Sequence, residues 1–512
     1  MEMVKRISIL AAVACCCAWA QLPAPGTPAR ARAAALPLSG VMSVGSASAQ
    51  QSASPGTGVA AVTSTTQIGG DYQGSVPATK IPSTGPITLS LNNAVQLGLR
   101  TNLGALSAAN TDEAMRARRL QALSALLPHI SASIGDTVQQ VNLAAYGFQF
   151  QAPPGLGFSI PSVVGPFNVS QAQASLSQSI WDPVARRNWK ATKATERAAS
   201  FSAMDARQLV VLAVGGMYMQ TVAERESVAS QQAQVANAQA VYNQAVVRKQ
   251  AGMNARIDVM RSLVELDTQK QRLSSLQSQL QKQKIAFARL VGVPLGRKLI
   301  LSDSLGFNKT AVPSAADAIQ AAFRRRPDLK AAEEQVRAAR RALSAAHAER
   351  LPSVSLSGDY GVIGPNPTSM HGVFTVAGSV DVPIWEGRRI KGDILQAEAT
   401  LRQRQAELAN ERGAIEENVR TALVDLRTAA GQVQLAGKNR DYAHETFSEA
   451  KDRFNAGVAS TVEVVQAQEQ VASAESDYIS SLYSFNLARL ALAKATGDAQ
   501  AGLPYSRKGG RP

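Results

Sequence analysis

Apolar residues recur at every seventh position near the end of the chain. They follow a glycine-containing break at Phe454–Gly457 and occupy Val464, Val471, Tyr478, Phe485 and Leu492. A strict seven-residue apolar period is the seam of a coiled coil. Roughly seventy residues without proline precede the break, as expected for a long helix. The pattern therefore predicts one long helical hairpin over residues 387–496.

The same pattern occurs once more, earlier in the chain. A shift of 205 residues places Gly457 on Gly252 and the terminal Gly497 on Gly292. The seam positions then fall on Val259, Leu266, Leu273, Leu280 and Phe287. A repeat that preserves seam, break and end together indicates an internal duplication. We expect a first repeat over 87–292 with its hairpin at 183–291, a linker over 293–312, and a second repeat over 313–497.

Ahead of each hairpin the apolar period changes to two. A helix starting near Asn92 is expected to stop at Pro128, and its counterpart in the second repeat to stop at Pro352. The alternating segments after these prolines predict strands at 129–138, 169–181, 353–361 and 373–385.

Strands of about ten residues, apolar on one side and small or polar on the other, fit a membrane-spanning β-barrel. A small soluble sheet packed on helices is the alternative. Four strands cannot close a barrel, and only a closed barrel has no unpaired edge in lipid. Three chains would supply twelve strands. The predicted fold is therefore mainly α with a membrane β-barrel, built from a duplicated helix–strand–strand–hairpin unit.

The two ends of the chain differ from its middle. Residues 1–20 combine Lys5-Arg6, an apolar run and a small-residue cleavage site, which predicts a secretory signal peptide. A lipoprotein signal cut before Cys15 is the alternative, although Ala12 stands where such signals usually carry Leu. Residues 21–86, rich in Ala, Ser, Gly, Thr and Pro, predict a low-complexity tail. Residues 498–512 are expected to be a C-terminal tail.

Composition excludes several classes of function. The formal charge is +15, but the bases alternate with acids along the helices, so nucleic-acid binding is not expected. The three cysteines are consecutive in the leader and the four histidines lie far apart, which leaves no His/Cys metal site. No nucleophile–base–acid set or phosphate-binding glycine loop is present. We expect neither an enzyme nor a cofactor.

Taken together, these features make the chain resemble the TolC-type outer-membrane efflux family over roughly residues 87–497. The strand exits Ile180–Pro183 and Ile384–Arg389 are similar to that family, as are Arg326-Pro327-Asp328-Leu329 and the segment Leu290–Gly296. One departure is the sequence Asn102-Leu103-Gly104, which stands where the second repeat has Arg326-Pro327-Asp328.

The resemblance implies a homotrimer, with a twelve-stranded barrel in the lipid of the cell outer membrane and a twelve-helix tunnel through the periplasm. It implies a periplasmic adaptor (membrane fusion) protein and an inner-membrane pump of RND or ABC type as partners. The chain would then be the passive exit duct of a tripartite efflux pump for small molecules. A duct for type I secretion or metal efflux has the same architecture, and a soluble periplasmic coiled-coil scaffold or adaptor is the alternative from another class.

The two hairpin breaks match the periplasmic tips of that family. Gly252 and Gly457 are expected to adopt left-handed backbone there, and an adaptor would dock on them and on the preceding Ala251 and Ala456. Just past the breaks, Asp258 and Glu463 would place six carboxylates at one constriction of a trimer, a candidate gate ring. Equally, these acids could only stabilise the positive ends of the returning helices. Possible bridging bases are Arg256, Arg261 and Arg453, with Arg248 and Lys249 close in sequence.

Overall fold

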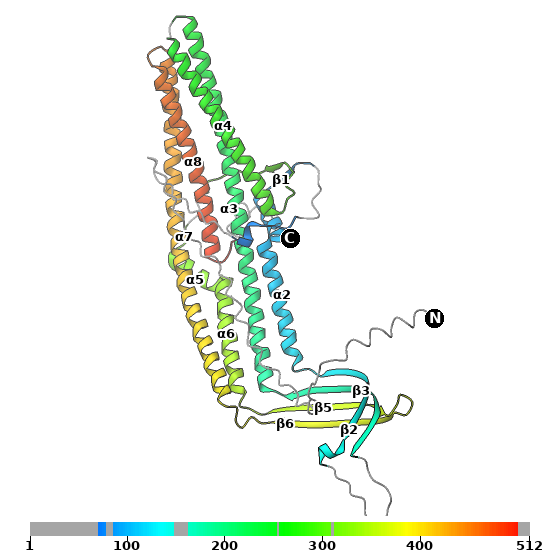
Figure 1. Ribbon diagram of the computed structural model, residues 1–512. Helices are drawn as coiled ribbons and strands as arrows, with labels where there is room; N and C mark the ends of the chain where they lie inside the picture. The colour runs from blue at the N-terminus through cyan, green and yellow to red at the C-terminus, as the bar shows by residue number, and fades with distance from the viewer. Residues whose placement is uncertain (1–69, 78–84, 148–161, 253–254, 309–311, 500–512) are drawn as a thin grey trace, which may run out of the picture. The chain divides into compact units, whose positions relative to one another are not determined.

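The computed structural model describes residues 70–77, 85–147, 162–252, 255–308 and 312–499 of the 512-residue chain (Figure 1). All of them belong to one compact unit. The predicted signal peptide, Cys15, most of the predicted 21–86 tail and nearly all of the C-terminal tail lie outside the described residues.

Two long helical hairpins make up most of the described chain (Figure 1). The first joins α3 (Pro183–Gln250) to α4 (Arg256–Val291), and the second joins α7 (Arg389–Asn455) to α8 (Thr461–Ala495). The predicted seven-residue seams are largely buried, since Leu266 and Val464 are 1% and 0% exposed. Half-buried Tyr478 is the exception in the second seam. It lines a cavity, and the guanidinium of Arg440 lies over its ring, 4.3 Å from the centroid.

Four antiparallel strands form one sheet in the order β2-β3-β5-β6. They are β2 (His129–Asn142), β3 (Val163–Trp181), β5 (Ser353–Gly364) and β6 (His371–Asp381). The first pair is longer than predicted, because a bulge after Gln139 lets Val141 and Asn142 pair with Val164 and Val163. β6 ends four residues before the predicted 385, since Pro383 lacks the N–H that the ladder needs.

The two faces of this sheet differ in polarity. Register places Ile130 opposite Leu176, Leu176 opposite Gly358, and Gly358 opposite Val376 on one face. The large side chains of this face are exposed in the single chain, as Ile134 (89%) and Phe374 (76%) illustrate. The other face carries mostly small or polar residues, which include Ser131, Ser133, Gln171, Gln173, Ser175, Ser177, Ser355, Ser357, Thr375 and Ser379.

Each repeat begins with a broken helix rather than the continuous one predicted from Asn92 to Leu127. In the first repeat α1 (Leu91–Thr101) is followed by α2 (Leu103–Ser124), with the break at Asn102. In the second, α5 (Ala315–Arg325) is followed by α6 (Pro327–Ala348), with the break at Arg326. The prediction of one uninterrupted helix was wrong at equivalent points of both repeats. The helices α2, α3, α6 and α7 pack side by side in that order.

Part of the predicted low-complexity tail is ordered. Residues 70–73 form the short 3₁₀ helix η1, and Ser75 bridges Asn102. The amide of Asn102 donates to the carbonyl of Tyr72 (2.8 Å), and Val76 N–H donates to the carbonyl of Thr101 (2.8 Å). The segment predicted to be disordered or weakly ordered therefore includes residues 70–77, which are ordered and pack against the first helix break.

Each repeat has its own apolar core. The first gathers around Val210, Val214 and Tyr218 of α3 with Phe287 of α4, and the second around Ile415 of α7 and its neighbours. Two short parallel strands, β1 (Ile87–Leu89) and β4 (Leu299–Leu301), close the first core. Sequence analysis missed this pairing, because strands of three residues are too short to show a period.

Candidate functional site

The hairpin tips contain the residues predicted to form the gate and the docking surface. At the second tip α7 ends at Asn455, Ala456 follows as its C-cap, and Gly457 has φ +81°. At the first, Ala251 caps α3 and Gly252 has φ +75°. Residues 253–254 lie outside the described residues. Both glycines adopt the predicted left-handed conformation.

Glu463 is held by one of the predicted bridging bases. Ser460 caps α8 by accepting a hydrogen bond from the backbone N–H of Glu463 (3.4 Å), which places the acid in the first turn. The carboxylate then pairs with the guanidinium of Arg453 at 3.0 Å, back across the turn. Both side chains are partly exposed, so this ion pair positions the carboxylate more than it stabilises the fold.

Asp258 is arranged differently. It lies in the first turn of α4 and is half-buried, and it forms no ion pair with any residue that the structure describes. The predicted bases Arg256 and Arg261 are exposed and likewise have no ion-pair partner in the described part of the chain. Within one chain, the structure therefore brings together Arg453 and Glu463 but neither Arg256 nor Arg261 with Asp258.

A contact that sequence analysis missed joins the two hairpins just below their tips. The guanidinium of Arg248 on α3 donates to the carbonyl of Asn455 on α7 (2.8 Å) and lies 4.4 Å from the ring centroid of Phe454. Gln244 donates to the side chain of Asn455. Phe454 is 2% exposed and packs with Val241 and Val464. Position 248 was among the bases near the tip, but its partner lies 207 residues away, which no local pattern reveals.

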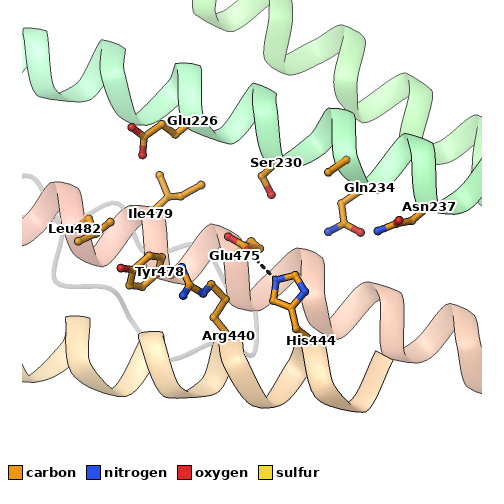
Figure 2. Close-up of a pocket in the computed structure, with 11 residues that line it drawn as sticks. Glu226, Ser230, Gln234, Asn237, Arg440, His444, Glu475, Tyr478, Ile479 and Leu482 are labelled. Atoms are coloured by element: carbon orange, nitrogen blue, oxygen red, sulfur yellow. Dashed lines mark hydrogen bonds and ion pairs between the residues drawn. The ribbon is translucent and has the colours of Figure 1, made fainter. Parts of the chain in front are cut away.

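Farther from the tips, the contact between the hairpins becomes polar. Gln468 of α8 donates to the carbonyl of Gln234 on α3 (3.1 Å), and both side chains are at least 97% buried. Next to them a cavity of about 320 Å³ separates α3 from α7 and α8 (Figure 2). His444 and Glu475 line it from the second hairpin, and His444 Nε2 lies 2.7 Å from Glu475 Oε1. A buried amide loses its hydration and a cavity leaves its lining without packing contacts, so this interface is less stable than one with apolar packing. The hairpins are therefore joined weakly here.

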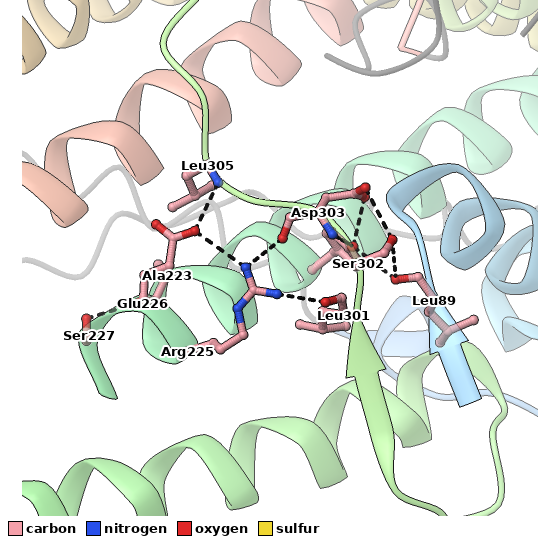
Figure 3. A network of polar contacts seen from close by, with 10 residues as sticks. Leu89, Ala223, Arg225, Glu226, Ser227, Leu301, Ser302, Asp303 and Leu305 are labelled. Carbon is pink, nitrogen blue, oxygen red and sulfur yellow. Dashed lines mark hydrogen bonds and ion pairs between the residues drawn. The ribbon is translucent and has the colours of Figure 1, made fainter. Parts of the chain in front are cut away.

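The linker between the repeats is fixed to α3 by a polar network (Figure 3). The guanidinium of Arg225 donates to the carbonyls of Leu301 and Asp303, each at 2.7 Å. The carboxylate of Asp303 accepts from Tyr218 (2.8 Å) and from the first N–H of α1, that of Leu91 (2.7 Å). Burial, together with the neighbouring Asp303, raises the pKa of Tyr218 well above its usual value. The network holds the linker against the middle of α3.

In the described ranges no group of three or more His, Cys, Asp or Glu side chains is placed to hold a metal ion. Of the helices in the described segments, none has the length and apolar character needed to span a membrane.

Comparison with known proteins supplies the remaining evidence. Residues 318–498 match the model of the family described as outer membrane efflux protein. The pyoverdine export outer membrane protein OpmQ of Pseudomonas putida is 25% identical over 305 residues, 57% of this chain and 63% of that protein. Nodulation protein T of Rhizobium leguminosarum bv. trifolii is 24% identical over 311 residues, 59% of this chain and 66% of that protein. The chain thus spans just under two thirds of the length of both relatives.

Among solved structures, the CmeC outer membrane channel of Campylobacter jejuni has a TM-score of 0.68 at 18% identity, covering 81% of this chain and 90% of that one. The outer membrane protein VceC of Vibrio cholerae has a TM-score of 0.66 at 17% identity, covering 80% and 96%. At these identities the likeness speaks to the fold, and the predicted fold class is confirmed.

Proposed function

We propose that this chain is a member of the outer membrane efflux protein family and the exit duct of a tripartite efflux pump. In this proposal it lies in the cell outer membrane, and most of the chain projects into the periplasm. It conducts small molecules passively, while an inner-membrane pump of RND or ABC type supplies the energy through a periplasmic adaptor. The name of the Pseudomonas relative, an export protein for pyoverdine, supports small organic molecules as cargo.

The observation that carries the proposal is the four-stranded sheet. It has one exposed apolar face and one polar face, and in the described part of the chain no strand pairs with the outer edges of β2 and β6. In hydrocarbon each unpaired backbone group along such an edge would cost several kcal/mol. Three copies would remove every edge by pairing β6 of one copy with β2 of the next. The apolar face would then meet lipid and the serine- and glutamine-rich face would line a water-filled barrel.

The helices support the same assembly. With 68 residues, α3 is about 100 Å long at 1.5 Å per residue, a length that can reach far into the periplasm. Since α2, α3, α6 and α7 pack side by side in that order, α2 and α7 are the helices left for contact with neighbouring copies. Three copies would supply the twelve helices of a closed tunnel.

The tips fit the roles of gate and docking surface. We place six carboxylates, from Asp258 and Glu463 of three copies, around the periplasmic entrance. Arg453 pairs with Glu463 across the second tip, and Arg248 joins the two hairpins just below the tips. Ala251, Gly252, Ala456 and Gly457 are all exposed, so an adaptor can reach them.

The function is tested by purifying the full chain from outer membranes of a Gram-negative host and reconstituting it in a planar bilayer. We expect a trimer with a small cation-selective conductance. A protein recovered from the periplasmic fluid, with no conductance, would instead identify a soluble scaffold. Complementation of a duct-deficient host with antibiotic, secreted-protein and metal challenges then separates small-molecule efflux from type I secretion and metal efflux.

The gate is tested in the same bilayer. Asp258→Asn with Glu463→Gln should lower cation selectivity, whereas Arg453→Gln should raise it by freeing Glu463. Asp267→Asn with Glu469→Gln removes two exposed acids of α4 and α8 away from the tips and serves as the matched control. A reversal potential that stays unchanged in every variant would leave these acids only the role of stabilising helix ends.

A further inference from the structure

We propose that a collar of basic side chains next to the four-stranded sheet binds the phosphate groups of anionic phospholipids in the periplasmic leaflet of the outer membrane. The inference rests on the proposed function, because it takes the sheet to be inserted in that membrane. The members of the basic collar are Arg186, Lys190, Arg350, Arg388 and Lys391.

All five side chains are exposed and close to a strand end. Arg186 and Lys190 lie in the first two turns of α3, which follows β3 directly. Arg350 precedes β5 by three residues, and Arg388 and Lys391 stand at the start of α7, after β6. At 1.5 Å per residue Lys190 is about 10 Å along α3. The headgroup layer of a bilayer is about 5–7 Å deep on each side, so these long side chains can reach it.

The acids near the collar are already occupied by other partners. Asp182 caps α3 by accepting the N–H groups of Val184 and Ala185, both at 2.9 Å. The carboxylates of Glu349, Glu386 and Asp393 all bind Arg389, at 2.7, 2.9 and 2.8 Å. No residue of the collar forms an ion pair with an acid in the described part of the chain. Five positive charges therefore remain available to an external anion.

The collar is also poorly explained by the stability of the helices. The helix macrodipole favours acids in the first turn, and α4, α5, α6 and α8 each have one there. The two helices that follow strands of the sheet, α3 and α7, have none, as do α1 and α2, and α3 and α7 both have bases in their first turns. Among the described residues Arg388 is the one non-glycine residue with positive φ (68°). The unpaired bases at these two helix starts are therefore available to an external anion.

The side chains of the collar could lie on either of two faces of the helical layer. Since α2 and α6 cover the flanks of α3, Arg186 and Lys190 point either outward or into the channel. We favour the outward direction because Trp181 (44% exposed) and Trp385 (82% exposed) stand at the same level. Exposed tryptophans at the ends of membrane-spanning strands mark the headgroup region. Basic residues beside such a belt meet lipid phosphates.

The test uses the full-length trimer in nanodiscs of phosphatidylethanolamine containing phosphatidylglycerol. Retained phosphatidylglycerol is counted by native mass spectrometry. Lys190→Gln with Lys391→Gln should weaken the binding of anionic lipid about 25-fold, at roughly fivefold for each of the two charges removed. The charge-conserving Lys190→Arg with Lys391→Arg should retain it. Arg272→Gln with Lys282→Gln, which removes the same charge from exposed positions of α4, should have no effect.

Each other outcome is informative, provided that heat-modifiable trimers persist in every variant. Equal retention of phosphatidylglycerol in the Gln variants of the collar and of α4 would overturn the inference. A shift of the single-channel reversal potential toward cations, with unchanged lipid, would assign the collar to the channel interior and also overturn it. A chain that never enters nanodiscs would instead contradict the proposed function itself.

Discussion

The helix breaks of the two repeats have nearly the same backbone but different chemistry. Asn102 has φ −65° and ψ 132°, and Arg326 has φ −61° and ψ 124°. Each lies between an 11-residue and a 22-residue helix, and both residues are at least 97% buried. The apparent departure of Asn102-Leu103-Gly104 from the second repeat is therefore a departure of side chains alone.

At the first break the buried Asn102 side chain binds neutral groups, one of which comes from outside the repeat. Asn102 accepts the N–H of Gly104 (2.9 Å) and donates to Tyr72, whose ring covers Gly104. The second break completes itself with an ion pair, in which the guanidinium of Arg326 binds the carboxylate of Asp328 through Nε (3.0 Å) and Nη2. Tyr72 thus stands in the first repeat where Asp328 stands in the second.

The ion pair of the second break is surrounded by further charges. Burial alone would raise the pKa of Asp328, but the hydrogen bonds and charge of Arg326 lower the pKa below its usual value. Burial raises the pKa of Asp205, and burial and the charge of Asp328 raise that of Glu411. Lys494 lies 3.9 Å from Asp205. The duplicated unit therefore keeps the same backbone bend with neutral hydrogen bonds in the first repeat and an ion pair in the second.

The largest difference between the breaks should appear when each central residue is removed. Arg326→Ala leaves Asp328 without its buried partner and should cost about 3–5 kcal/mol. Asn102→Ala removes neutral hydrogen bonds and should cost about 1–3 kcal/mol. Thermal and guanidinium unfolding of the detergent-solubilised trimers measure both. Equal losses would mean that the charge at position 326 has no special weight.

Gly292 and Gly497, which follow the return helices, should respond alike to substitution, because each lies against a helix break. A Cβ at Gly292 (φ +73°) would meet the Cβ of Thr101 at 2.8 Å, and one at Gly497 (φ +84°) would meet the backbone N of Arg326 at 2.9 Å. Alanine at either site should cost about 2–4 kcal/mol from left-handed strain and overpacking. Gly457→Ala is the matched control, because its Cβ would enter open space and only strain remains. A control as damaging as the other two would contradict the packing argument.

The role of Tyr72 is tested by a double-mutant cycle. A Cβ at Gly104 would collide with the Tyr72 ring, so Gly104→Ala alone should destabilise the protein by about 1–3 kcal/mol. In the Tyr72→Ala background the same change should become neutral or stabilising by up to about 1 kcal/mol, because alanine is the better helix former. Urea unfolding of the four proteins gives the coupling energy. Additive effects would show that Tyr72 does not fill this position.

The smallest expected effect is a pH dependence confined to the second break. A carboxyl whose pKa is raised on folding gives stability that is complete below its unfolded pKa and is lost as pH rises through the folded value. Asp205 and Glu411 should therefore weaken the fold as pH rises above about 4. Asp328, with a lowered pKa, acts in the opposite sense only below that pH. Asp205→Asn with Glu411→Gln should reduce the dependence of the unfolding free energy on pH between pH 4 and 8. A slope unchanged by the substitutions would contradict this origin.

Local patterns were sufficient wherever the determining residues are neighbours in sequence. The seven-residue seams, the prolines that end α2 and α6, and the left-handed Gly252 and Gly457 follow from periodicity and backbone sterics within a few turns. The alternating strands and their two faces follow from the two-residue period. Glu463 lies in the first turn of α8, as expected from its position just past the break at Gly457.

Tertiary structure decided the features whose partners are distant in sequence. Asn102 caps α2 locally by accepting the N–H of Gly104, but Tyr72 and the end of α4, which pack at this break, come from outside residues 87–127. β1 needs β4 more than 200 residues away, and Arg248 needs Asn455. Asp303 caps α1 from 212 residues away. Helix and strand periods are local properties of a chain, whereas the satisfaction of buried polar groups depends on which distant atoms the folded chain brings within hydrogen-bonding distance.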